Sequence, residues 1–191
     1  FTLLETCVAL ALFSGVGYSL TLAMDASQRS QNAVQTMASG ARAQRQASMQ
    51  LLEELGSSSD ARISVSVLSD GNHRLRFPLP IDVGTTADWG VHDARLGSDD
   101  ESQTQVGWNV QYRVSSTVQD GVTQRQLVRE VVDANEAVQL TDVLLSGLCD
   151  GDSDRPGFHA VKTGAVWVVT ICTQSGTSGH SREEFHVHAR N

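Results

Sequence analysis

The sequence predicts an α+β protein in which one long N-terminal helix is followed by a mostly antiparallel β-sheet head. Residues 1–55 contain no proline and are rich in apolar and other helix-forming residues. After Gly56 the pattern changes to alternating apolar and polar residues, broken by Asp-Gly pairs that are typical of hairpin turns. With 191 residues the chain is long enough for one such head and an appendage, and short for two ordinary domains.

Residues 1–24 form the most apolar segment of the chain. Glu5 is their only charged side chain, and as a helix they would be roughly 36 Å long, enough to cross a bilayer. The segment lacks the basic start and the small-residue cleavage site of a secretory signal peptide. We therefore expect a helix that a membrane or a filament core covers, in a chain that was cut before Phe1.

Glu5 is the unusual residue of this segment. A carboxylate inside a membrane helix costs a few kcal/mol on insertion scales, so it needs a partner. The nearest one is the α-amino group of Phe1, in the same chain or in a neighbouring copy packed in register. The alternative is the ordinary preference of carboxylates for the positive end of a helix.

The string Phe1-Thr2-Leu3-Leu4-Glu5, followed by an unbroken apolar helix, resembles the mature N-terminus of type IV pilins and type II secretion pseudopilins. The resemblance implies that a prepilin peptidase cuts before Phe1, that the Phe1 amine is methylated, and that Glu5 directs docking into the growing filament. It also implies an inner-membrane assembly platform, membrane lipid before assembly, and copies of the chain or other pilins as partners in a helical filament.

The segment departs from many major pilins at position 22, where they often have proline and this chain has Leu22. Small residues stand in its middle instead, namely Ser14, Gly15 and Gly17. Glycine weakens a helix interior, whereas in lipid small residues let helices approach closely. Local melting of the helix and tight packing both remain open here.

Residues 25–55 are expected to continue the helix with one face laid against the head, and Gly56 is expected to end it. Glu53 and Glu54 are expected to be solvated. The predicted organisation is thus an apolar membrane or filament-core helix over 1–24, an amphipathic continuation over 25–55 and a globular β-rich head over 56–191.

The head is predicted to contain two hairpins and a later pair of strands. Residues 81–105 are expected to form a long exposed loop, and residues 135–148 fit either a short helix or a strand with a turn. The final strand is expected to pair with the last long apolar one. The predicted strands lie at residues 62–67, 73–77, 106–114, 124–132, 164–173 and 183–190.

Several widely spaced features of the head are similar to J-type minor pseudopilins and their pilus counterparts. They are a Tyr-Arg strand at residue 112, a Leu-Val-Arg strand at residue 127, a strand centred on Trp167 and an Arg-Asn ending. We nevertheless favour a major subunit over a J-type minor subunit.

The composition argues against several other classes of protein. The formal net charge is -8 and Lys162 is the only lysine, so strong nucleic-acid binding is not expected. The sequence has no nucleophile elbow, phosphate loop or dinucleotide fingerprint. We therefore expect that the protein is not an enzyme, and the sequence identifies no cofactor with certainty.

Two cysteines lie in the head, Cys149 and Cys172, and the third, Cys7, lies in the apolar segment. In an oxidising compartment, Cys149 and Cys172 are candidates for a disulfide. Two buried free thiols are the alternative.

Two sets of residues in the head are candidate metal ligands. Asp150, Asp152 and Asp154 place three carboxylates at alternate positions and make calcium a candidate ligand, with a solvated acidic loop as the alternative. His186 and His188 could hold zinc with His159 or His180, but a polar surface row is the expectation for them.

These patterns together predict a structural subunit of a type IV pilus-like or pseudopilus filament. Before assembly the chain is expected in the cytoplasmic membrane with its head outside the cytoplasm, and afterwards in a surface pilus or a periplasmic pseudopilus. The rival hypothesis is a signal-anchored surface or periplasmic binding module, in which the helix is only a tether.

Overall fold

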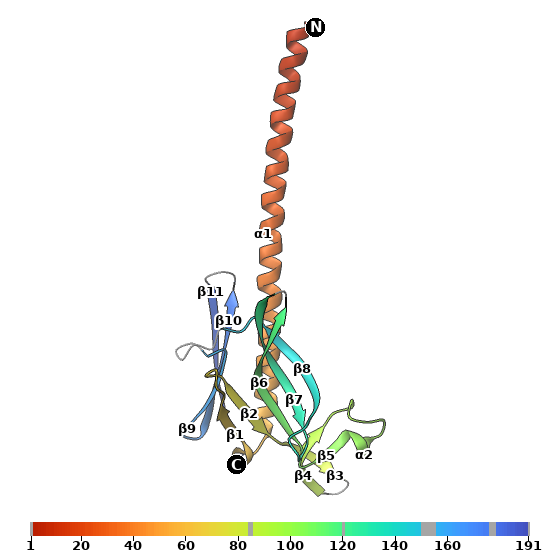
Figure 1. Ribbon diagram of the computed structural model, residues 1–191, viewed down its shortest axis with the longest axis vertical. Coiled ribbons are helices and arrows are strands. Elements are labelled where there is room, and N and C mark those ends of the chain that lie inside the picture. The colour runs from red at the N-terminus through yellow and green to blue at the C-terminus, as the bar shows by residue number, and fades with distance from the viewer. Residues whose placement is uncertain (1, 84–85, 120, 150–155, 176–178, 191) are drawn as a thin grey trace. The chain divides into compact units, whose positions relative to one another are not determined.

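The computed structural model describes residues 2–83, 86–119, 121–149, 156–175 and 179–190. The chain divides into two compact units, Phe1–Arg42 and Ala43–Asn191. The helix α1 (Leu3–Ser57) begins in the first unit and ends in the second, and all the strands belong to the second unit (Figure 1). The α+β class predicted from the sequence is confirmed, with one long helix followed by antiparallel sheets.

The helix α1 is continuous over 55 residues. It contains no proline, and it passes without a break through Gly15, Gly17 and Gly40. It ends at Ser57, two residues beyond the predicted last helical residue. The Ser57 hydroxyl donates a hydrogen bond of 2.8 Å to the carbonyl of Glu54, and the Ser58 amide donates to the same carbonyl at 3.2 Å. These bonds satisfy a carbonyl of the last turn, which has no partner within the helix.

The main sheet has five strands in the order β1-β2-β6-β7-β8, and all neighbouring strands are antiparallel. Two of its turns contain Gly71 and Gly121, whose φ angles of 77° and 75° lie in the left-handed region that favours glycine. Residues 135–148, for which a short helix and a strand with a turn are both open from the sequence, contain a turn followed by the strand β8. The bounds are β1 (Ser64–Val67), β2 (His73–Phe77), β6 (Asn109–Gln119), β7 (Val122–Val132) and β8 (Val138–Ser146).

A second sheet has three strands in the order β11-β10-β9. Its strands are β9 (Phe158–Thr163), β10 (Val166–Ser175) and β11 (Gly179–Val187). The expected pairing of the final strand with the last long apolar strand is confirmed, because β11 pairs with β10 from Trp167 to Ser175. Val169 and Ile171 of β10 are fully buried and belong to the core.

The expectation of a long loop over residues 81–105 is wrong. This region contains most of a third sheet, β3 (Leu79–Val83), β4 (Thr86–His92) and β5 (Thr104–Val106), together with the short helix α2 (Asp100–Gln103). Pro80, which has no amide hydrogen to donate, is tolerated because β3 is an edge strand. An edge strand has a neighbour on one side only, so not every amide has to donate to the sheet. Gly90 permits the close pairing of β4 with β5, since a Cβ there would lie 2.1 Å from the carbonyl oxygen of Gln105.

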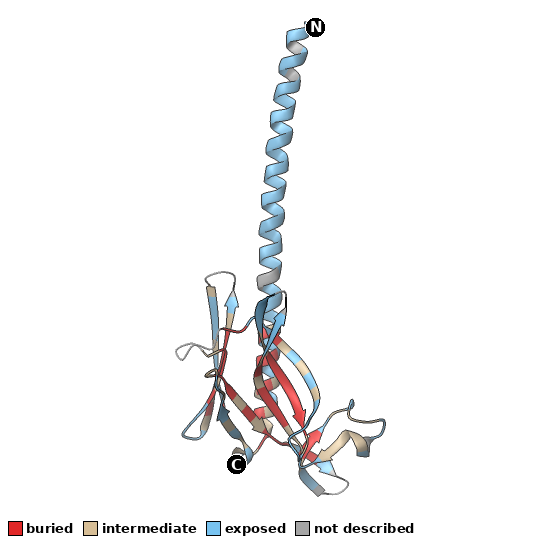
Figure 2. Ribbon diagram, in the orientation of Figure 1, coloured by how far each residue is buried: buried red, intermediate tan, exposed pale blue. Residues whose placement is uncertain are grey.

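The core of the second unit lies between the last turns of α1 and the sheets, with the 3-10 helix η1 (Asp60–Arg62) after α1. Leu51 and Leu55 of α1 are fully buried, and buried residues gather on this part of α1 and on the strands (Figure 2). Their strand partners include Leu75, Phe77, Tyr112, Leu127, Val131, Phe158 and Trp167.

Candidate functional site

The first part of α1 carries large apolar side chains that none of the described residues covers. Leu3, Phe13 and Val16 are 86%, 84% and 69% exposed, and the ribbon of this part of α1 is coloured exposed wherever burial is described (Figure 2). The other exposed large apolar residues of this part of α1 are Leu4, Val8, Leu10, Leu12, Tyr18, Leu20, Leu22 and Met24. A helix that is apolar on all its faces is typical of a membrane span or of a helix buried among others.

The length of this apolar surface matches a membrane. From Leu3 to Met24 it extends about 33 Å at ~1.5 Å per residue, close to the ~30 Å of a bilayer core. It ends at Asp25, whose carboxylate accepts a hydrogen bond of 2.8 Å from Arg29 one turn later. The helix is therefore long and apolar enough to cross a membrane, and after Glu5 the next charged side chain, Asp25, stands where the span would end.

The serine and threonine hydroxyls between Thr6 and Thr21 are satisfied inside the helix. Ser14 donates to the carbonyl of Ala11 at 2.9 Å, and Ser19 donates to that of Gly15 at 2.9 Å. Thr6 and Thr21 donate in the same way to carbonyls three and four residues earlier. Because these hydroxyls need no water, they add little to the cost of placing the helix in lipid.

The small residues predicted to confer flexibility or packing lie in uninterrupted helix. A Cβ atom built on Gly15 or Gly17 would meet nothing within 4 Å. No packing against the described residues therefore requires glycine at either position. The backbone of Ser14, Gly15 and Gly17 is consequently open to close approach by another helix.

Several predicted site residues lie outside the described part of the structure. Phe1 is one of them, and for Glu5 the structure describes the helical backbone but not the side chain. Asp150, Asp152 and Asp154, the candidate calcium ligands, also lie outside the described residues.

The last turns of α1 are fixed to the main sheet by a buried ion pair that the sequence did not predict. Glu54 was expected to be solvated, but one of its oxygens accepts from Arg129 Nε at 2.9 Å and the other from the Tyr112 hydroxyl at 2.7 Å. The Arg129 side chain is 6% exposed and that of Glu54 is 16% exposed. Desolvation and the neighbouring Glu54 charge raise the pKa of Tyr112, so its hydroxyl stays protonated and donates.

Two further carboxylates extend this network across the loop after β4. Arg95 donates to Asp93 and, through both terminal nitrogens, to Asp142 of β8 at 2.6 and 2.8 Å. The hydrogen bonds from Arg95 lower the pKa of Asp93 to about 2, and they also lower the pKa of Asp142. Asp93 and Asp142 lie 3.8 and 3.7 Å from Arg129, so their charges also face that buried guanidinium.

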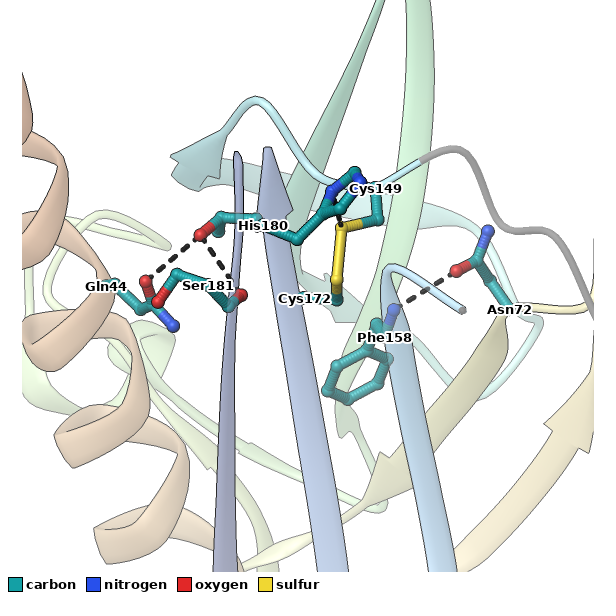
Figure 3. The surroundings of a disulfide bond; sticks show 8 residues. Gln44, Asn72, Cys149, Phe158, Cys172, His180 and Ser181 are labelled. Carbon is teal, nitrogen blue, oxygen red and sulfur yellow. Dashed lines mark hydrogen bonds between the residues drawn. A yellow bond between two sulfur atoms is a disulfide. The ribbon is translucent and has the colours of Figure 1, made fainter. Parts of the chain in front are cut away.

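The two head cysteines form a disulfide between the segment after β8 and strand β10 (Figure 3). Cys149 and Cys172 are 2% and 5% exposed, and Cys7 in α1 is a free, exposed thiol. His180 of β11 lies beside the bond, with its Nδ1 3.6 Å from Cys149 Sγ. Sequence spacing did not identify His180 as the neighbour of the cysteines, because the hairpin β10–β11 brings it there.

The histidines that the sequence suggested as zinc ligands do not gather. Among the described residues, the one group of at least three histidine, cysteine or acidic ligand atoms within reach of a single ion is Cys149, Cys172 and His180. His186 lies near Glu184 at 3.4 Å, and His188 follows the end of β11. Both histidines are exposed, as expected for a polar row on the surface.

No protein-family model, curated protein or solved structure matches this chain. The long apolar helix followed by antiparallel sheets is compatible with a pilin-like layout. The resemblance itself is confined to the N-terminal motif and the weaker features of the head.

Proposed function

We propose that this protein is a structural subunit of a type IV pilus-like or pseudopilus filament that polymerises through the first part of α1. The observation that carries the proposal is an unbroken helix with exposed apolar residues on every face from Leu3 to Met24. Water would have to solvate all of that surface in a free monomer, which is unfavourable by about 25 cal/mol per Å². Membrane lipid before assembly and a bundle of like helices afterwards would each cover it.

The hydrogen bonds of the helix hydroxyls suit both membrane lipid and a bundle of helices. Thr6, Ser14, Ser19 and Thr21 direct their donors to the carbonyls of their own helix. The same helix can therefore pass from lipid to a helix bundle without gaining or losing a hydrogen bond at these residues. The open backbone at Gly15 and Gly17 would let neighbouring helices approach closely in the filament.

Glu5 is the proposed assembly residue. Its charge lies in a segment where an unpaired carboxylate costs a few kcal/mol, and the amine of Phe1 on a neighbouring subunit would neutralise it. Pairing between subunits would also set the register in which copies stack. The proposal includes cutting before Phe1 by a prepilin peptidase, methylation of the new amine and handling by an assembly platform of the inner membrane.

The test of assembly compares Glu5→Val with Asp25→Asn in the organism that makes the protein. We expect the Glu5 variant to stay in the membrane fraction while filaments recovered by shearing, or periplasmic pseudopili, are lost. Asp25→Asn, which changes a carboxylate at the end of the apolar segment, should leave filaments intact. Normal filament yield from Glu5→Val would refute the proposal.

A second measurement separates the filament subunit from the rival hypothesis, a signal-anchored binding module. Mass analysis of the chain purified from its own membrane should show Phe1 as the N-terminal residue, carrying one added methyl group. An N-terminus elsewhere, or an unmodified amine together with monomeric chains, would favour the tethered binding module. Electron microscopy of the same material distinguishes a major subunit, present along the filament, from a J-type minor subunit at low copy number.

A further inference from the structure

The disulfide region places three soft or borderline metal ligands at one point of the head. Cys172 of β10 pairs with Arg182 of β11, and Gln174 pairs with His180. Cys172 and His180 therefore project from the same face of the hairpin. They are diagonal neighbours, because His180 lies two residues before Arg182, the residue opposite Cys172. Cys149 reaches that face from the segment after β8. The sulfur and nitrogen donor atoms of the three residues all lie within 4.8 Å of one another.

The spacing of these atoms fits a tetrahedral zinc site once the disulfide is reduced. With Zn–S bonds of about 2.3 Å and Zn–N bonds of about 2.0 Å, a tetrahedral ion separates two sulfurs by about 3.8 Å and a sulfur from a nitrogen by about 3.5 Å. Cys149 Sγ already lies 3.6 Å from His180 Nδ1. The Cα atoms of the cysteines are 5.5 Å apart, so rotation of their side chains can separate the sulfurs without displacing a strand.

Backbone hydrogen bonds hold both cysteines in place independently of the disulfide. The Cys149 amide donates to the Cys172 carbonyl at 2.9 Å, and the Cys172 amide donates to that of Gly157 at 2.9 Å. The Gln174 amide donates to the Gly147 carbonyl at 2.8 Å. These bonds link the segment that carries Cys149 to β10 on both sides of the cysteine pair, so the ligand geometry is expected to persist after reduction.

We propose that the reduced protein binds one Zn²⁺ through Cys149, Cys172 and His180. Three protein ligands leave a fourth position for water or another small ligand. Structural zinc sites differ, because four protein ligands close them. The disulfide and the metal occupy the same two sulfurs, so they are alternative states of one site. The head would then hold zinc while its thiols are reduced and release it when they are oxidised.

The two states are connected by a balanced exchange. A phosphine or dithiol reductant supplies two electrons that break the sulfur–sulfur bond, and two protons convert the sulfurs to thiols. Binding of Zn²⁺ then displaces those two protons to solvent while neutral His180 donates a nitrogen lone pair. In the reverse direction, a disulfide oxidant takes the two electrons from the bound thiolates and two protons from solvent and leaves as two thiols. The protein sulfur–sulfur bond forms again and Zn²⁺ dissociates.

Cobalt titration of the full chain in detergent micelles tests the site. All samples carry Cys7→Ser, which removes the third thiol, and are reduced with a phosphine under anaerobic conditions. Addition of Co²⁺ should give near-ultraviolet thiolate-to-cobalt charge transfer and visible bands of tetrahedral Co²⁺, both saturating at one ion per chain and both abolished by Zn²⁺. The unreduced protein should give neither band. Absence of both bands in the reduced protein would overturn the proposal.

His180→Ala and His186→Ala form a matched pair, because both histidines are exposed on the same strand. His180→Ala should weaken Co²⁺ binding by at least about tenfold, the lower end of what even outer-shell changes cost. His186→Ala should leave binding unchanged. Equal affinities of the two variants would show that His180 is not a ligand and would reject the site as proposed.

X-ray absorption of the zinc-loaded reduced protein gives a readout that needs no histidine variant. A zinc shell of two sulfurs with imidazole nitrogen supports the site, and a shell of nitrogen and oxygen alone contradicts it. If reduction unfolds the head, recovery of the native circular dichroism on addition of Zn²⁺, dependent on His180, supports the proposal. Failure of Zn²⁺ both to bind and to restore the fold rejects it.

Discussion

At the scale of single residues, Glu54 differs from its neighbour Glu53 in a way that controls how α1 is held. The carboxylate of Glu54 accepts hydrogen bonds from Tyr112 and Arg129, whereas Glu53 is exposed. A buried guanidinium that loses its carboxylate becomes an uncompensated charge, and this is costly. The pair therefore couples the register of the helix to strands β6 and β7.

The first prediction concerns this pair. Glu54→Gln should lower the free energy of unfolding of the head by about 2–3 kcal/mol, because the amide keeps the shape of the side chain but removes the charge that faces Arg129. Glu53→Gln, an exposed change, should alter it by less than about 0.5 kcal/mol. Urea unfolding followed by tryptophan fluorescence measures both variants, since Trp89, Trp108 and Trp167 all lie in the second unit. Equal effects would contradict the importance of the ion pair.

The second prediction concerns acid stability through Asp93. Its pKa in the folded chain is about 2 against an ordinary value of 3.8, because Arg95 donates hydrogen bonds to its charged form. A lowered pKa contributes stability above the ordinary value and loses it as the pH falls through the folded value. The head should therefore lose about 2 kcal/mol from this group between pH 4 and about pH 2.

The variant Asp93→Asn isolates that contribution. It should be less stable than the parent at pH 6, and its stability should fall less steeply between pH 4 and about pH 2. Asp82→Asn, which changes an exposed carboxylate of β3, is the control and should follow the parent. Parallel pH profiles for Asp93→Asn and the parent would show that Arg95 does not lower the pKa of Asp93.

At the scale of elements, α1 changes its environment along its length. Its apolar residues up to Met24 are exposed in the part of the chain that the structure describes, while Leu51 and Leu55 lie in the core. The same secondary structure therefore serves two purposes, a surface for lipid or other helices and a central support for the sheets. Helix propensity explains why α1 forms, and packing explains why its last turns stay folded.

The third prediction tests the packed part of α1. Leu51→Ala should cost about 3 kcal/mol in unfolding free energy, because it removes a fully buried side chain and leaves a cavity. Met49→Ala, two residues earlier and 69% exposed, should change stability by about 0.5 kcal/mol or less. Thermal unfolding of the detergent-solubilised full chain gives the comparison. A large effect at Met49 would mean that this face of the helix is covered as well.

At the scale of the whole molecule, the disulfide closes a long stretch of chain. Cys149 and Cys172 are 23 residues apart in sequence, and the enclosed segment contains β9 and the start of β10. The crosslink restricts the unfolded chain and so stabilises the folded head. It also fixes the segment after β8 against the second sheet.

The fourth prediction is that replacing both Cys149 and Cys172 with serine lowers the unfolding free energy by about 3 kcal/mol, from the loop entropy of this separation. Cys7→Ser, in the apolar part of α1, should leave the unfolding of the head unchanged. Urea titrations with and without a phosphine reductant measure the effect, and the reductant should lower the midpoint only where both head cysteines are present. Insensitivity of the parent to the reductant would contradict the crosslink.

Local sequence patterns predicted much of the fold. The apolar run, the change to alternation after Gly56 and the Asp-Gly turns all depend on residues close together in the chain, and each led to the element that the structure contains. The third sheet was missed because residues 81–105 are polar and irregular in sequence, a pattern that is typical of an exposed loop. Whether Pro80 can join a strand depends on β3 lying at a sheet edge, which is a property of the assembled sheet.

The sequence by itself determined that this chain has a long helix with an apolar first part and a single acid at position 5, because helix period and hydrophobicity are local properties. Only the tertiary structure decided that Glu54 is buried against Arg129 and that His180 lies beside the Cys149–Cys172 bond. Those contacts join residues 75 and 31 positions apart. They arise from strand pairing and helix packing, which bring together side chains whose spacing in the sequence carries no signal.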